Sequence, residues 1–208
     1  MAIMSDEEAK AARALAPLGQ VIVTEASNLA RYVGRVLGTV PEDAVGLVIG
    51  DPLGFVRTAI AGQYDVWLDR LQTRRNVTIT QPVSPSVAIP LIRAAYDESR
   101  PELQELWAGL IAAAMDPARS GRVRLSFIET LKQFDPLDAL VLRARHTPQA
   151  TPAIGPFADV LASTLGATRD EVLLSVDNLI SLRCIERDGG NGLHVSRYGR
   201  ALLAACSD

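Results

Sequence analysis

The stretch from Ser99 to Leu142 restricts the fold of this chain more than any other part of its sequence. Its first half places apolar residues three and four positions apart, the spacing that gathers them on one face of an α-helix. These apolar positions are Leu103, Leu106, Trp107, Leu110, Ile111 and Met115. Three helix-start signals accompany them: the capping-box pairs Ser99 with Glu102 and Ser126 with Glu129, and Asp135 followed by Pro136. We therefore expect a helix, a short loop and two further helices, with Trp107 in the core.

The composition is that of a folded protein without an electrostatic preference for nucleic acid. The 208 residues are 48% hydrophobic, which allows a sizeable core. The 21 basic and 24 acidic side chains give a net charge of −3 and are evenly balanced in each part of the chain. Cys184 and Cys206 form no Cys-x-x-Cys pair, and we expect both to be small apolar core residues. The acidic N-terminus lacks the pattern of a secretory signal, so the expected location is cytoplasmic.

Helical patterns also precede the central stretch. Ser5 with Glu8 predicts a first helix, and residues 20–37 predict a second that stops at Gly38. Further helical segments are expected from Pro41 and from Asp51. Residues 76–86 contain two prolines and alternating β-branched residues, which predicts an extended linker, and Pro90 then begins a short helix.

Residues 44–62 are apolar and rich in glycine, and they exceed the needs of one buried helical stripe. Three alternatives could shield this apolar segment from water: the N-terminal helices of the same chain, a second subunit in a homodimer, or a membrane. Charged residues interrupt the segment before it reaches the roughly 18 apolar residues that a spanning helix needs, so membrane contact is the less favoured option. If a dimer forms, Val48 and Phe55 are the expected interface residues.

The C-terminal part has a different pattern. Residues 147–156 are rich in proline and predict a linker between a helical body, residues 1–146, and a small domain, residues 157–208. This domain reads as two helices, a β-hairpin and a last helix, the order of a winged helix. The elements are a helix at Phe157–Leu165, a helix capped by Thr168 and Glu171, strands at Cys184–Glu186 and Leu193–Val195, and a helix capped by Ser196. The predicted fold is mainly α, a multi-helix body followed by a winged-helix-like domain with one hairpin.

Several runs together resemble one known family. These runs are ELQELWAGLIAAAMDP, SFIETLKQFDPLDALVL, VDNLISLRCIE and SRYGRALLAAC, with IGDPLGFVRTAIAG upstream. They are similar to the bacterial Abi-alpha family, whose name links it to abortive infection, and the resemblance covers roughly residues 40 to 206. The resemblance implies a role in phage defence, and it transfers no catalytic residue.

Residue patterns for catalysis, metal binding and cofactor binding are absent from the sequence. Neither a Gly-x-Ser-x-Gly elbow nor a phosphate-binding loop occurs. His146 and His194 have no second metal ligand at helical or hairpin spacing. Arg143 precedes His146 by three residues, which is closer than the Arg–His spacing of phage-defence ribonucleases. We therefore expect a protein that is not an enzyme, with no catalytic residue, no metal and no cofactor.

Four arginines are the candidate contacts to a partner or to phosphates: Arg169, Arg183, Arg187 and Arg197. Acidic residues accompany them along the predicted helix before the hairpin, so DNA binding is expected to be weak or absent. The favoured hypothesis is a non-enzymatic interaction protein of phage defence that acts through protein contacts with an unidentified partner. A winged-helix DNA-binding regulator and a membrane-perturbing toxin remain open as alternatives.

Overall fold

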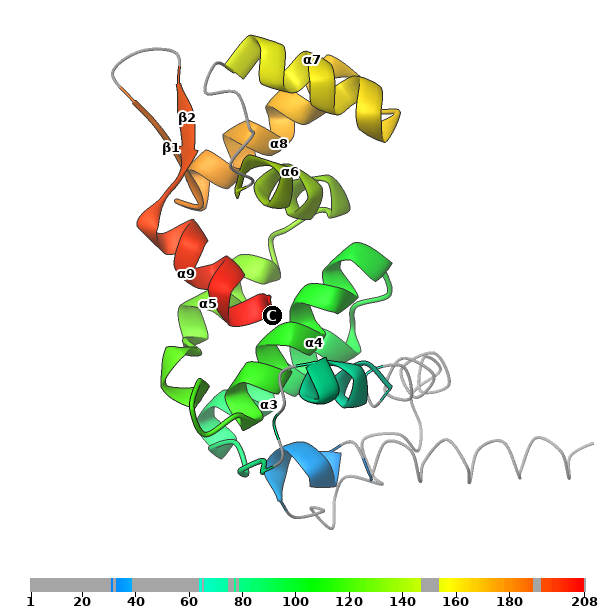
Figure 1. Ribbon diagram of the computed structural model, residues 1–208, viewed down its shortest axis with the longest axis vertical. Helices are drawn as coiled ribbons and strands as arrows, with labels where there is room; N and C mark the ends of the chain where they lie inside the picture. Colours follow the sequence, from blue (N-terminus) through cyan, green and yellow to red (C-terminus); the bar gives the residue numbers. More distant parts are fainter. Residues whose placement is uncertain are drawn as a thin grey trace, which may run out of the picture.

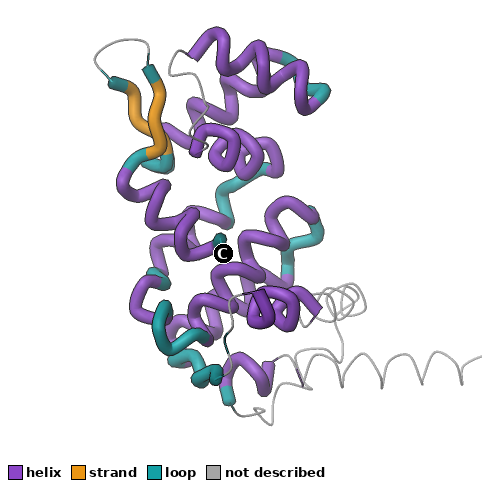
Figure 2. The backbone as a smooth tube through the Cα atoms, viewed as in Figure 1, coloured by secondary structure: helices purple, strands orange, loops and turns teal. Residues whose placement is uncertain are grey.

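Helices make up most of the structure, a computed structural model that describes residues 31, 33–38, 64, 66–74, 77, 79–146, 154–188 and 192–207 (Figures 1 and 2). The elements are α3 (Pro85–Tyr96), α4 (Pro101–Met115), the 3-10 turn η2 (Ser120–Arg122), α5 (Leu125–Leu131), α6 (Pro136–His146), α7 (Ile154–Leu165), α8 (Arg169–Ser181), β1 (Ile185–Arg187), β2 (Leu193–Val195) and α9 (Arg197–Cys206). The prediction of a mainly helical protein with one C-terminal antiparallel hairpin is confirmed. The arrangement of a winged helix stays a prediction.

Helix α4 lies at the centre of the core. The predicted apolar stripe is buried, and Trp107 is only 1% exposed. Burial extends beyond that stripe, because α3, α6 and α9 all pack against α4. The alanines of α4 are buried in these contacts. Small side chains at these positions let the surrounding helices come close. The central-helix prediction is confirmed, and the helix is more enclosed than one amphipathic stripe implies.

The backbone of helix α9 lies directly against Gly109 of α4. A β-carbon added to Gly109 of α4 would lie 1.7 Å from the carbonyl oxygen of Cys206 at the end of α9. At the beginning of α9, a β-carbon on Gly199 would lie 2.1 Å from the carbonyl oxygen of Cys184. Both helix contacts therefore require glycine. The C-terminal helix is packed against the body at one end and against the base of the hairpin at the other.

Helices α6, α7 and α8 and the hairpin form the other end of the molecule (Figure 1). Helix α8 packs on both α6 and α7, and β1 pairs with β2 so that Ile185 faces Val195. Asp138 of α6 is 1% exposed and accepts hydrogen bonds from Ser175 Oγ at 2.6 Å and Asn178 Nδ2 at 2.7 Å. A buried carboxylate needs such donors, and these two tie α6 to α8. The predicted division at residues 147–156 stays a prediction, while buried apolar side chains continue on both sides of it.

Two of the predicted helix starts are wrong. Arg100, not Ser99, is the N-cap of α4, because Glu98 accepts hydrogen bonds from both the backbone N–H and the guanidinium of Arg100. Burial raises the pKa of Glu98, but these hydrogen bonds outweigh it and leave the pKa below its ordinary value. Helix α5 begins at Leu125, and Glu129 pairs with Lys132 instead of closing a capping box.

Some of the other predicted helix boundaries are confirmed and some are wrong. The capping box of Thr168 with Glu171 and the Ser196 cap are both present, and α6 starts after Asp135 as predicted. Helix α3 begins at Pro85 rather than Pro90, because proline fits the first turn, and Pro90 inside it removes only one hydrogen bond. Helix α7 likewise begins at Ile154, ahead of the predicted Phe157.

The remaining N-terminal predictions meet the structure only in part. The helix expected to stop at Gly38 does so, with the glycine at a φ of +74°. The first predicted helix and residues 44–62, with Val48 and Phe55, lie outside the described residues. Among the helices that are described, none combines the length and apolar character needed to cross a bilayer.

Removing the Trp107 side chain should destabilise the fold by about 3 to 5 kcal/mol, because it leaves a large cavity in the core. Chemical denaturation of Trp107→Ala measures this loss. Trp67→Ala is the matched control and should lose less, because Trp67 is only partly buried beside Tyr64. Equal losses in the two variants would contradict the central position of α4.

Gly109→Ala should displace α9 and lower the free energy of unfolding by about 1 to 3 kcal/mol or more, because the backbone of Cys206 occupies the space that the methyl group needs. Gly121→Ala is the control, since a β-carbon there meets no atom within 4 Å. Thermal unfolding of both variants makes the comparison. A Gly109→Ala protein as stable as the wild type would rule out the close crossing.

Candidate functional site

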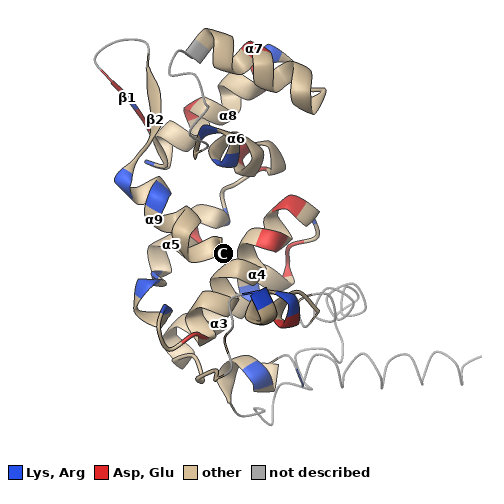
Figure 3. Cartoon of the chain, in the orientation of Figure 1, with Lys and Arg blue, Asp and Glu red and all other residues tan. Residues whose placement is uncertain are grey.

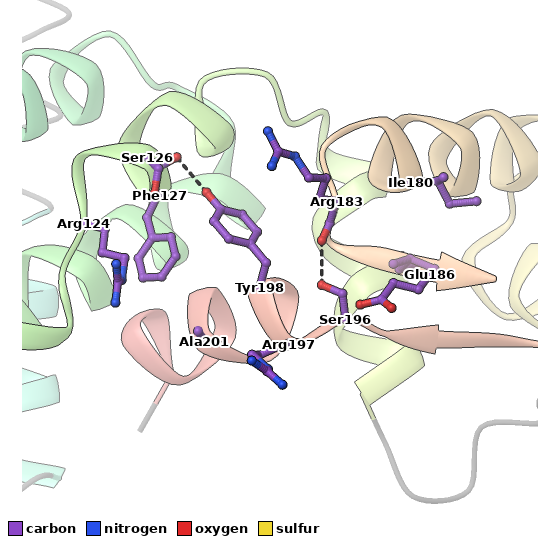
Figure 4. A pocket seen from close by; sticks show the side chains of 11 residues that line it. Arg124, Ser126, Phe127, Ile180, Arg183, Glu186, Ser196, Arg197, Tyr198 and Ala201 are labelled. Carbon is purple, nitrogen blue, oxygen red and sulfur yellow. Dashed lines mark hydrogen bonds between the residues drawn. The ribbon is translucent and has the colours of Figure 1, made fainter. Parts of the chain in front are cut away.

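A groove of about 700 Å³ opens where α5, the end of α8, β1 and the beginning of α9 meet (Figure 4). We call it the Tyr198 groove. It is lined by Arg124, Ser126, Phe127, Ile180, Arg183, Ile185, Glu186, Ser196, Arg197, Tyr198 and Ala201. Its volume lies in the range of about 300 to 1,000 Å³ that is usual for ligand sites in proteins.

Tyr198 forms one wall of the groove and joins α9 to α5. Its hydroxyl donates a hydrogen bond to the Ser126 carbonyl at 2.9 Å and shares a second one of 2.8 Å with the Thr130 hydroxyl. Its ring meets Phe127 edge to face, with the ring centroids 5.3 Å apart. Aromatic pairs favour this arrangement. Tyr198 is therefore held at both its ring and its hydroxyl, and the wall is rigid.

The opposite wall is the corner between α8 and β1. Arg183 has a φ of +59°, which is uncommon for a residue with a side chain. Ser196 supports this corner: its hydroxyl donates to the Arg183 carbonyl at 2.5 Å, and its backbone N–H donates to the Cys184 carbonyl at 3.0 Å. The Ser196 hydroxyl also caps α9 by accepting from the N–H of Gly199. One serine thus fixes the corner and the helix start together.

Cys184 lies behind this wall and belongs to the core. Burial, with a smaller contribution from the Asp138 carboxylate, raises the pKa of its thiol to about 12. The thiol is therefore protonated at neutral pH and has no role as a nucleophile. Cys206 is buried as well, so the prediction that both cysteines are core residues is confirmed.

Three exposed arginines surround the apolar part of the groove: Arg124 before α5, Arg183 after α8 and Arg197 at the start of α9. In Figure 4 their side chains stand on different sides of Tyr198. Within the described part of the chain, none of the three has an ion-pair partner. Of the described residues that line the groove, Glu186 alone is acidic. Figure 3 shows basic segments before α5 and at the beginning of α9 on the same side of the molecule.

Of the four arginines predicted from the sequence to contact a partner or phosphates, two line the groove and two form ion pairs elsewhere. Arg183 and Arg197 both line the Tyr198 groove. Arg169 lies 3.2 Å from Asp159 of α7, and Arg187 lies 2.9 Å from Asp177 of α8, so both are neutralised by ion pairs away from the groove. The predicted interface residues Val48 and Phe55 lie outside the described residues.

Sequence reasoning missed Arg124, Phe127 and Tyr198. Phe127 and Tyr198 stand in helices that were predicted, but no local pattern indicates that those helices face each other. Arg124 precedes a helix and was hidden by the incorrect capping box at Ser126. A half-buried aromatic with a polar tip, here Tyr198, often marks a contact between elements, and this residue type is the signal that the sequence offered.

A second hollow of about 560 Å³ adjoins the groove and shares Ser126, Arg183 and Tyr198 with it. Its other lining residues are Glu129, Thr130, Gln133, Ser181 and Leu182. Both hollows border Tyr198, α5 and the end of α8. A ligand that reaches both would be extended rather than compact.

Helix α8, the element that would enter a DNA groove in a winged helix, presents acidic side chains to the surface. Asp170, Glu171 and Asp177 are exposed, and Leu174 is 69% exposed. His146 and His194 are also exposed, at the end of α6 and in β2. Among the residues that the structure describes, no three of the histidines, cysteines and acids come together as metal ligands would.

The described elements define a mainly α-helical protein with a small C-terminal hairpin and a basic-rimmed apolar groove. A family model described as Abortive infection alpha matches residues 63–206. The chain belongs to the Abortive infection alpha family, and membership suggests a function of the abortive-infection type. No curated protein and no solved structure matches the chain in the same comparisons.

Duplex DNA should bind weakly and without sequence preference, because the exposed face of α8 is acidic and two of its neighbouring arginines are already in ion pairs. Fluorescence anisotropy with labelled duplexes at several salt concentrations measures this. A tight complex whose affinity falls steeply with salt would overturn the prediction.

Proposed function

We propose that this protein is a non-enzymatic component of an abortive-infection system that binds a protein partner through the Tyr198 groove. The observation that carries the proposal is the groove itself, an apolar hollow bounded by three arginines without ion-pair partners in the described chain. Family membership supplies the biological setting. The place of action that we expect is the bacterial cytoplasm.

The groove has the features of a protein-binding surface. Its core is apolar and contains a fixed aromatic residue, while charged residues stand at its rim, which is the usual anatomy of an interface. Tyrosine and arginine are the residue types that most often carry binding energy at such surfaces. Because the Tyr198 side chain and the Arg183 backbone are already held in place by the fold, binding there costs little ordering of this part of the receptor.

Infection of a bacterial strain that expresses the protein tests the proposal. We expect the wild type to lower the plating efficiency of at least one phage in a panel and to lower survival of the infected cells. Arg124→Glu combined with Arg197→Glu should abolish both effects, because the reversed charges repel the partner from the groove.

Arg70→Glu combined with Arg93→Glu is the matched control. Both arginines are exposed, lie outside the groove and have no ion-pair partner among the described residues, so the pair changes the net charge equally. We expect this control to protect like the wild type. Full protection by the Arg124/Arg197 variant, or absence of protection by the wild type against every phage, would contradict the proposal.

A further inference from the structure

We propose that the occupant of the Tyr198 groove is an extended acidic peptide segment of the partner, with an apolar anchor residue seated against Ile180. This inference rests on the proposed function in taking the partner to be a protein, and it adds the chemistry of the segment that binds. Charge, the nature of the floor and the shape of the depression each lead to it.

Charge is the first argument. Several arginines elsewhere on the described surface are matched locally: Arg143 lies 2.8 Å from Glu105, and Arg35 lies 2.7 Å from Asp69. Others, such as Arg70 and Arg93, have no ion-pair partner among the described residues but do not line the groove. Around the groove, by contrast, Arg124, Arg183 and Arg197 share one hollow and have no such partner in the described residues. Gathering like charges around an apolar surface is unfavourable until a ligand neutralises them. Carboxylates match the fork of the guanidinium group and bind it bidentately.

The floor decides between a protein and a nucleic acid. Proteins that bind single strands offer open aromatic faces on which bases stack. Here Phe127 is buried to 1% exposure, and Tyr198 is half-buried with its ring edge to face against Phe127. Ile185 is equally buried, so the partly buried Ile180 provides the accessible aliphatic surface of the floor. An aliphatic or aromatic side chain of a peptide would remove this surface from water, whereas a sugar-phosphate backbone would not.

Shape is the third argument. The groove and the adjoining hollow share Ser126, Arg183 and Tyr198, so a ligand that fills both must run past Tyr198. An extended peptide advances by about 3.3 Å per residue and presents side chains to alternate sides, which lets one residue reach the floor while its neighbours meet the arginines. A compact small molecule would fill only one of the two hollows.

Glu186 gives the inference a sharp test. It is exposed and, among the described residues, is the only carboxylate that lines the Tyr198 groove, so it repels an acidic ligand. Glu129 lines the adjoining hollow, where it is paired with Lys132. Glu186→Gln keeps the size of the side chain and removes its charge. The variant should therefore bind an acidic peptide more tightly than the wild type and a basic peptide less tightly, a pair of effects that a loss of structure would not produce.

The experiment is fluorescence anisotropy with the full chain and short labelled peptides of defined composition. The main probe has a central Phe-Leu pair flanked on both sides by Asp and Glu. One control peptide replaces its acids with Lys, and a second keeps the acids and replaces Phe-Leu with Ser-Ser. A single-stranded oligonucleotide of thymidines is the fourth probe.

We expect the main probe to bind, and each control peptide to bind at least about tenfold more weakly, a loss of about 1.4 kcal/mol. Arg124→Glu with Arg197→Glu should weaken the main probe by about tenfold or more, the Arg70/Arg93 control should not, and Glu186→Gln should strengthen it several-fold. Arg183→Gly is a further test of the role of the charge. The substitution removes the cation but keeps the backbone conformation, because glycine readily adopts the φ of +59° at this position.

Two results would overturn the inference: equal binding of the acidic and lysine peptides, or tighter binding of the oligonucleotide than of the main probe. Absence of peptide binding, with phage protection still lost in the Arg124/Arg197 variant, would reject the acidic-peptide chemistry and leave the proposed function intact. Protection that survives that variant rejects the proposed function itself.

Discussion

The contact between Gly109 and the end of α9 is the constraint on which the rest of the structure depends. Two helix backbones can meet this closely only where one of them carries no side chain, and α4 offers that position at Gly109. Helix α9 is thereby pressed against the most buried helix of the molecule. Everything attached to α9, including the hairpin that leads into it, takes its position from this crossing.

The groove follows from the same placement. Once the end of α9 is fixed on α4, its first turn lies between α5 and the base of the hairpin, where Gly199 allows contact with the Cys184 carbonyl. Tyr198 then reaches Ser126 and Thr130, and Ser196 reaches the Arg183 carbonyl. These hydrogen bonds close the sides of the hollow without filling it. The result is a preformed surface that needs little rearrangement to bind a ligand.

Electrostatics separates this surface from the rest of the protein. Net charge and the even distribution of acids and bases along the chain indicate no preference for an anionic partner, and α8 is acidic on its exposed face. The fold nevertheless brings Arg124, Arg183 and Arg197 around one hollow while pairing Arg169 and Arg187 with acids. Local charge after folding therefore differs in sign from the net charge of the sequence, and only the local value acts on a ligand at short range.

The sequence by itself determined the elements whose signals are local: the buried stripe of α4, the hairpin, and the caps of α8 and α9 at Thr168 and Ser196. Periodicity and side-chain capping act over three or four residues, so a linear reading finds them. Tertiary structure decided the start of α4, because the hydrogen bonds that Arg100 donates to Glu98 replace the Ser99 capping pattern. It also decided the groove, since Arg124 and Tyr198 meet only after α9 docks at Gly109, and no spacing in the sequence encodes a contact between such distant residues.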